Sequence, residues 1–179
     1  LLSRQLTIDR LHFDGLELHL PPEKTPSEPS PPLLPDIRAP LDVTITDLQG
    51  RNIRIVPAEG QPIEIDAIDL KARMAADGIK IDNLAVKSPL AEARLSGQAN
   101  PTGNYPLQFD LDWQAPLAHY GVFHGQGKVQ GELRDKLTLT HQITGPATLQ
   151  LDAEVRKPLT EAAWSAKAKL DIPDLKPFA

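Results

Sequence analysis

The chain has 179 residues, of which 40% are hydrophobic and 24% are charged, and its formal net charge is −5 at pH 7. This composition is that of a folded protein with one core or one extended layer. An acidic chain without any run rich in Lys and Arg argues against a nucleic-acid partner, because such a partner needs a clustered basic surface. The absence of cysteine excludes disulfides and thiolate metal sites.

The sequence divides into three parts by composition. We expect the first β-strands in residues 1–20, a Pro-rich linker or flap in residues 21–40, and a continuous, repetitive β segment in residues 41–179. The linker rests on the stretch PPEKTPSEPSPPLLP, which holds seven of the 18 prolines. The chain starts with LLSRQLTI, without an initiator Met or a signal-peptide pattern, and no apolar run approaches the about 18 to 20 residues of a membrane span. We therefore expect a fragment of a longer protein.

Three stretches share one local pattern: LTIDRLHF (residues 6–13), IEIDAIDLK (63–71) and IKIDNLAV (79–86), with a weaker fourth copy in VTITDLQG (43–50). In the strong copies an apolar-x-Ile pair is followed by Asp, one variable residue and an apolar-x-apolar pair. Because side chains of a strand alternate with a period of two, the apolar face would flip after each Asp unless the chain forms a bulge or a corner. We predict such kinks, with the carboxylates accepting hydrogen bonds from freed backbone N–H groups, at Asp9, Asp66 and Asp82.

The rest of the chain alternates apolar and polar residues almost without interruption, and most remaining prolines fall between the alternating runs. This pattern predicts roughly a dozen strands. Residues 159–170 come nearest to a helical pattern, but they alternate from Trp164 onward, and we favour a strand there. An all-β chain with short connections favours a meandering sheet. The pattern alone leaves open whether the apolar face is covered in a closed β-sandwich, closed in a barrel, or left in an open trough.

The stretch GVFHGQGKVQG, residues 121–131, invites comparison with a phosphate-binding loop. That loop needs four residues between its first Gly and the Gly-Lys pair, followed by Ser or Thr. Here five residues separate Gly121 from Gly127, and Val129 follows Lys128. The glycines share odd positions with apolar residues, which predicts a strand whose apolar face is locally stripped of side chains. A tight bend in a curved sheet, a ligand or another backbone could explain that patch.

No set of residues in the sequence indicates catalysis. The five histidines are scattered, and the two nearest, His119 and His124, would lie on opposite faces of a strand. No stretch resembles a nucleophile elbow. We expect no enzyme activity, no catalytic residues, no cofactor and no metal.

Three features carry a resemblance to a known family. They are the Pro-rich run into PPLLPDIRAPLDVTITDLQGRNIRI (residues 31–55), the Ile-Asp-x-Leu repeats, and the stretch from AEARLSGQA to YPLQFDLDWQ (91–114). In these the chain resembles the TamB group of the AsmA-like family of Gram-negative envelope proteins. The resemblance implies an elongated sheet curled into a taco-like open hydrophobic groove in the periplasm. It also implies an inner-membrane anchor through an N-terminal helix and a contact with the outer-membrane barrel protein TamA, both of which we expect outside this segment.

The resemblance further implies phospholipid as the partner, with the groove shielding acyl chains during transport between the two membranes. An alternative is a scaffold that assists outer-membrane protein assembly by β-augmentation. A third possibility, an enzyme or carbohydrate-binding domain built on the Asp kinks, fits poorly because aromatic residues for stacking on sugars are scarce. Central members of the alternating runs predict the groove lining: Ile45, Ile55, Ile65, Leu70, Ile81, Val86, Leu95, Phe109, Leu111, Val129, Leu139 and Leu151.

Overall fold

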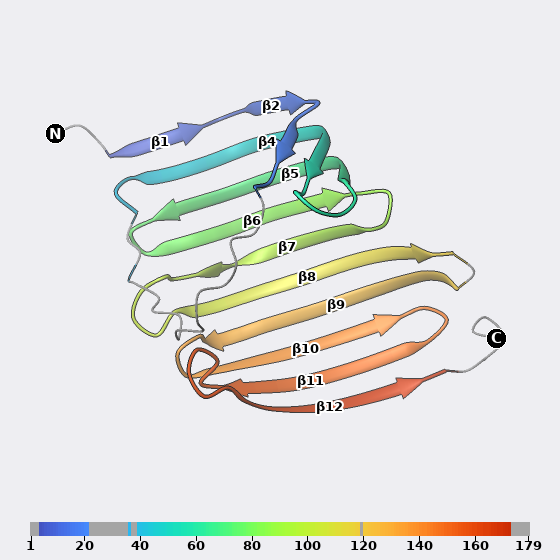
Figure 1. The fold of residues 1–179 in the computed structure, drawn as a ribbon. Coiled ribbons are helices and arrows are strands. Elements are labelled where there is room, and N and C mark those ends of the chain that lie inside the picture. Colours follow the sequence, from blue (N-terminus) through green and yellow to red (C-terminus); the bar gives the residue numbers. More distant parts are fainter. Residues whose placement is uncertain (1–3, 22–35, 37–38, 119, 173–179) are drawn as a thin grey trace.

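A computed structural model describes residues 4–21, 36, 39–118 and 120–172 of the chain (Figure 1). The described residues form twelve strands in one sheet and no helix, which confirms the all-β prediction. Residues 159–170, the stretch nearest to a helical pattern, contribute to the last strand. The strands are β1 (Gln5–Ile8), β2 (Leu11–Asp14), β3 (Glu17–His19), β4 (Asp42–Val56), β5 (Ile63–Ala75), β6 (Gly78–Lys87), β7 (Glu92–Ala99), β8 (Pro106–Leu117), β9 (Gly121–Glu132), β10 (Lys136–Thr144), β11 (Thr148–Arg156) and β12 (Ala163–Asp171).

The sheet is an open meander from β4 to β12. Each of these strands pairs antiparallel with its neighbours in sequence, as short connections require. The first strand, β1, and the last strand, β12, lie at opposite edges of the sheet (Figure 1). Among the described residues the sheet therefore neither closes into a barrel nor folds into a second layer, and the open arrangement predicted for this chain is the one observed.

The three N-terminal strands depart from the meander because all of them pair with β4, and they run parallel to it. Their register is constant, since Gln5 pairs with Asp42, Leu11 with Leu48 and Glu17 with Arg54. Residues 5–19 thus follow β4 position by position. The break between β1 and β2 and the break between β2 and β3 each lie beside an irregular position of β4. The connection to β4 falls mostly in residues 22–35, 37 and 38, so the predicted linker or flap lies outside the described residues.

The predicted kinks take three different forms. At Asp82 the register of β6 shifts against both β5 and β7, which is a β-bulge. Near Asp66 the register of β5 against β4 is unchanged, and the irregularity is a corner shared with β4, where Asn52 has a φ of +53°. Asp9 lies in the break between β1 and β2. A second bulge occurs in the weaker copy of the motif, between Ile45 and Leu48 of β4.

Along β4 the apolar face is formed by even-numbered residues directly before the corner, such as Leu48, and by odd-numbered residues after it, such as Ile53. The corner keeps these residues on the same side of the sheet. A Cβ built on Gly50 would collide with the Phe13 ring and lie 3.0 Å from Ile53 Cδ1, so Ile53 faces the same side as Gly50. Ile53 is only 6% exposed. Figure 1 shows β3 and the end of β4 turning sharply away from the direction of the strands before them. The corner therefore makes one of the few enclosed apolar clusters of the described chain.

The described chain has almost no closed core. Only Ile53, Ala75 and Tyr105 are buried among its hydrophobic residues, and no large side chain is fully buried. A folded protein of this size ordinarily encloses many apolar side chains between two layers. One apolar face of this sheet is accordingly left without a covering layer in the described part of the chain.

Candidate functional site

The apolar face of the sheet is built from rows of side chains that cross the strands at the same level. Directly paired residues lie on the same face of a sheet, so the register defines each row. One row, which we call the leucine row, consists of six leucines in consecutive pairing across β2 and β4–β8. Its members are Leu11, Leu48, Leu70, Leu84, Leu95 and Leu111.

The row next to the leucine row places Ile8, Ile45, Ala72, Ile81, Gly97, Phe109, Val129, Leu139, Ala153 and Ala166 side by side. The row on the other side places Phe13, Gly50, Ile68, Val86, Ala93, Trp113, Gly125, Ile143, Leu149 and Leu170 side by side. Neither of these rows contains a charged residue, so the apolar surface is continuous from one edge of the sheet to the other.

All twelve residues predicted to line a groove lie on this face. The row of Phe109 contains five of them: Ile45, Ile81, Phe109, Val129 and Leu139. The leucine row and its continuation across β9–β11 contain four: Leu70, Leu95, Leu111 and Leu151. The row of Trp113 contains Val86. The remaining two, Ile55 and Ile65, follow the corner, where Ile65 pairs with Ile53. Leu111 and Leu139 are each 37% exposed, so the face is accessible from outside. The structure brings the predicted residues together in space; their function as a lining remains a prediction.

The opposite face is mainly polar. One of its rows contains Thr44, Arg73, Lys80, Gln98, Gln108, Gln130, Thr138 and Glu154. One depression of the described sheet is lined largely by this face, through Arg94, Asp110, Asp112 and Gln126. The two faces therefore differ sharply in chemistry, which is the arrangement of a sheet with one face in water and one face against apolar material.

The glycines of β9 lie on the apolar face, as predicted, but the space above them is filled. Gly125 pairs with Trp113, and a Cβ added there would collide with the indole ring. A Cβ added at Gly127 would collide with Nδ1 of His141. The glycines thus let side chains of the neighbouring strands lie over the β9 backbone, an aromatic covering of glycine known from other sheets. Because residues 121–132 form a strand, the phosphate-loop interpretation is excluded.

Trp113 on β8 and His141 on β10 meet above these glycines. The indole Nε1–H donates a hydrogen bond to His141 Nε2 over 3.2 Å. The two ring planes are within 12° of each other, with centroids 6.1 Å apart. The leucine row continues beyond Leu111 through Gly127 of β9, His141 of β10 and Leu151 of β11, so His141 lies at the same level of the sheet as the six leucines. It is the one ionisable side chain in the three rows described above.

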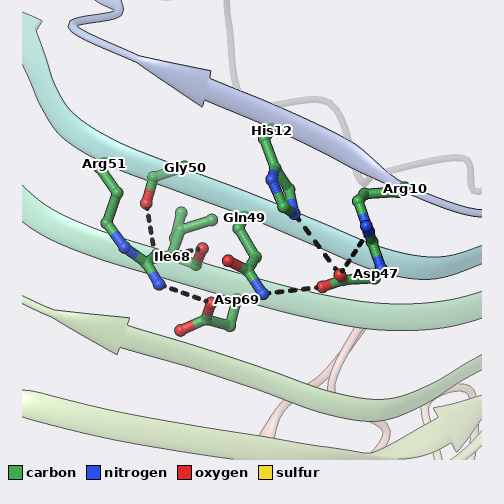
Figure 2. A network of polar contacts seen from close by, with 8 residues as sticks. All are labelled: Arg10, His12, Asp47, Gln49, Gly50, Arg51, Ile68 and Asp69. Atoms are coloured by element: carbon green, nitrogen blue, oxygen red, sulfur yellow. Dashed lines mark hydrogen bonds and ion pairs between the residues drawn. The ribbon is translucent and has the colours of Figure 1, made fainter.

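Asp47, at the bulge of β4, joins the N-terminal strands to the sheet on the polar face (Figure 2). Its carboxylate lies 3.6 Å from Arg10 Nε and 3.5 Å from His12 Nε2, and it accepts a hydrogen bond from the Gln49 side-chain amide over 3.0 Å. Within the described chain the partners of Asp47 are side chains. Asp82 likewise pairs with a side chain, whereas we predicted backbone N–H groups as its partners. The partner of Asp82 is the Lys80 ammonium, at 2.9 Å.

Arg51 forms a second polar link, from β4 to β5. Its guanidinium donates hydrogen bonds to the carbonyl oxygens of Gly50 (2.9 Å) and Ile68 (3.3 Å), and it lies 3.1 Å from the Asp69 carboxylate (Figure 2). The bonds to the carbonyl groups lie beside the corner at Asn52. Arg51 therefore ties the two strands together where their backbones turn.

Three carboxylates of the polar face have lowered pKa values because of neighbouring cations. The hydrogen bond and the charge of Lys87, 3.0 Å away, lower the pKa of Glu92 below its ordinary value, and Glu92 raises the pKa of Lys87. The Arg156 hydrogen bond lowers the pKa of Glu154, and the Lys80 hydrogen bond lowers that of Asp82. All of these groups are at least partly exposed, so the pairs stabilise the fold only slightly.

The described residues contain no group of three or more His, Asp or Glu side chains that could hold a metal ion. They also contain no helix with the length and apolarity to cross a membrane. His119, one of the two neighbouring histidines of the sequence, lies outside the described residues. The feature that remains as a candidate site is the uncovered apolar face.

Sequence reasoning missed several members of this face. Leu11, Leu48 and Leu84 belong to the leucine row, and each stands directly after the kink in a copy of the repeated motif. Their common position in that motif was a usable signal. No sequence signal indicated that Trp113 and His141 meet, because their contact depends on the register of two strands on either side of β9.

Comparison with known proteins identifies the family. Residues 1–176 match the family model described as TamB, N-terminal domain. No solved structure matches the chain. The match spans nearly the whole sequence and agrees with the repeated motifs and with the open sheet. The chain belongs to the TamB family of Gram-negative envelope proteins.

Proposed function

We propose that this segment shields phospholipid acyl chains on its apolar face as part of a periplasmic bridge for lipid transport between the inner and outer membranes. The observation that carries the proposal is the continuous apolar surface of the leucine row and its two neighbours, which no second layer covers in the described chain. Soluble proteins rarely expose contiguous apolar surface of this extent, and such surfaces mark binding sites.

The energetics of lipid transfer match such a surface. An acyl chain of about 16 carbons loses roughly 0.8 kcal/mol per CH₂ when it passes from a bilayer into water, or about 10 to 13 kcal/mol in all. An aliphatic lining cancels most of this cost. The polar headgroup stays in water because the sheet is open, and a row of similar leucines presents a nearly uniform surface to a sliding chain.

The test is photocrosslinking in cells with the full-length protein. A photoreactive residue replaces Phe109 or Leu139, which share one apolar row, and the matched controls replace Asp110 and Thr138, their neighbours on the polar face. We expect phospholipid adducts, identified by mass spectrometry, at the first pair and not at the second. Equal labelling of both pairs, or no lipid adduct at either, would refute the proposal.

A second candidate function is a scaffold that captures strands of outer-membrane proteins. It is favoured by β12, whose nine residues are all exposed and which pairs only with β11 among the described strands. Replacing Ala166 or Ala168 by Pro removes a backbone donor from β12. If β12 captures client strands, these changes impair assembly of outer-membrane proteins more than a charge placed in the leucine row does. The lipid proposal predicts the reverse order.

A further inference from the structure

We propose that His141 is a hydrogen-bond donor set into the apolar lining, and that its Nδ1–H binds the ester carbonyl of an acyl chain. This inference rests on the proposed function and names a residue that selects among lipids. His141 stands in line with the leucine row, between Gly127 and Leu151. A polar ring at this level therefore interrupts an otherwise aliphatic surface.

The partner of His141 determines which ring nitrogen carries the proton. The indole N–H of Trp113 can only donate, so Nε2 of His141 must accept in their 3.2 Å hydrogen bond. A neutral imidazole that accepts at Nε2 carries its hydrogen on Nδ1. Trp113 therefore leaves Nδ1 as a donor.

The Nδ1 atom lies over Gly127, where an added Cβ would collide with it. Among the described residues Nδ1 takes part in no hydrogen bond, whereas Nε2 is bonded to Trp113, and the side chain is only partly buried. Because Gly127 has no side chain, it leaves room for the imidazole ring of His141. The neighbours of His141 on the apolar face are Leu139 and Ile143, in the rows on either side.

The surroundings define the ligand. A donor among leucine, isoleucine and glycine is best satisfied by an acceptor that is itself attached to hydrocarbon, because a fully hydrated group gains little by leaving water. The ester carbonyl of a diacyl phospholipid joins the acyl chain to the glycerol and has this chemistry. An ether-linked lipid with the same chains and headgroup lacks the carbonyl oxygen.

The experiment compares diester and diether phosphatidylethanolamine with identical C16 chains, as competitors of a fluorescent phospholipid bound to the full-length protein. We expect the wild type to prefer the diester about three- to tenfold, the ratio that one net hydrogen bond supports. His141→Phe keeps a ring over Gly127 and removes the donor, so the preference falls to about one while the diether still binds. His124→Phe, on the polar face of β9, is the matched control and leaves the preference unchanged.

A second variant tests the positioning role of Trp113 without altering His141. In Trp113→Phe the Nε2 acceptor loses its donor, and we expect the diester preference to fall while circular dichroism reports an unchanged sheet. Equal binding of both lipids by the wild type, or a full preference retained in His141→Phe, would overturn the inference. A wild type that binds neither lipid would instead refute the lipid-binding function on which it rests.

Discussion

Gly15 and Asn52 stand side by side on parallel segments, and both have a left-handed backbone, with φ of +73° and +53°. Asp14 pairs with Arg51 just before them and Glu17 pairs with Arg54 just after them, so Gly15 and Asn52 lie opposite each other in the same register. The Asn52 side-chain amide donates a hydrogen bond to the Asp14 carboxylate over 2.8 Å. The corner that starts at Asp66 of β5 therefore continues through β4 and into the N-terminal strands. Three segments turn together, which preserves both their pairing and their common apolar face.

The corner predicts a specific order of stability at position 52. Asn tolerates the left-handed region better than most residues, and Gly enters it without steric cost, whereas a β-branched side chain does not. We expect Asn52→Val to lower the free energy of unfolding by about 1 to 2 kcal/mol and Asn52→Gly to change it little. Urea unfolding followed by circular dichroism measures both. Similar losses in both variants would show that the bond to Asp14, not the backbone conformation, stabilises the corner.

The close packing of His141 over Gly127 predicts that adding a single methyl group at Gly127 destabilises the fold. In Gly127→Ala the new Cβ occupies the place of His141 Nδ1 and must push the ring away, which breaks its bond to Trp113. We expect a loss of about 1 to 3 kcal/mol in stability. A shift of Trp113 fluorescence, recorded in a Trp164→Phe background, should accompany it. Lys128→Ala, at the next residue and on the polar face, serves as the control and should shift neither value.

The proposed lipid function predicts that a charge on the apolar face slows lipid transfer without loss of fold. Leu111 is 37% exposed, so Leu111→Lys leaves no buried cavity and the sheet remains folded. The ammonium nevertheless interrupts the leucine row, where a passing acyl chain would have to desolvate it. We expect roughly tenfold slower lipid transfer between vesicles, which corresponds to about 1.4 kcal/mol. Asp112→Lys, on the other face of the same strand, should transfer lipid at the wild-type rate.

The Lys87–Glu92 pair predicts a weak acid-dependent contribution to stability. The lowered pKa of Glu92 means that the folded state holds the proton less tightly than the unfolded state does. The stabilisation is therefore complete above the ordinary pKa of 4.5 and disappears as the pH falls through the lowered value. The raised pKa of Lys87 acts at the other end: its contribution is present at neutral pH and disappears as the pH rises beyond 10.5.

Thermal unfolding of the wild type and Glu92→Gln measures this contribution. We expect a slightly lower melting temperature for the variant at pH 7, and curves that converge in acid. Salt should reduce the difference at pH 7, because solvent reaches both groups. A difference that persists unchanged in acid would assign the effect of the substitution to altered packing against Gln114, which donates a hydrogen bond to Glu92 over 3.0 Å.

The sequence predicted the faces of the strands better than their pairing. Alternation of residues such as Phe109, Asp110 and Leu111 determines which side chains share a face, since the period of a strand is local. The parallel pairing of β1–β3 with β4 was not predicted, because it depends on a connection of more than twenty residues. The change of apolar positions at Asp66 and at Asp82 looks the same in sequence, yet one is a corner and the other a bulge. Only the partner strand distinguishes them.

His141 shows the same limit for the candidate site. Its position in an alternating run, KLTLTHQIT, places it on the apolar face from sequence alone. Its partner Trp113 lies 28 residues earlier, and the two meet only because Gly125 and Gly127 fall between them in the register. Prediction of that contact requires the pairing of three strands at once.

The meander also determines how the segment responds to force. From β5 to β12 every strand is held only by its neighbours in sequence, through hydrogen bonds that run perpendicular to the strands. A pull that separates β12 from the rest loads these bonds one after another rather than all at once, as in opening a zipper. The sheet should therefore yield hairpin by hairpin at low tension and re-form in the same order, as expected for a structure whose contacts are all between neighbours. A protein of this design can lengthen under strain between two surfaces without losing the strands that remain paired.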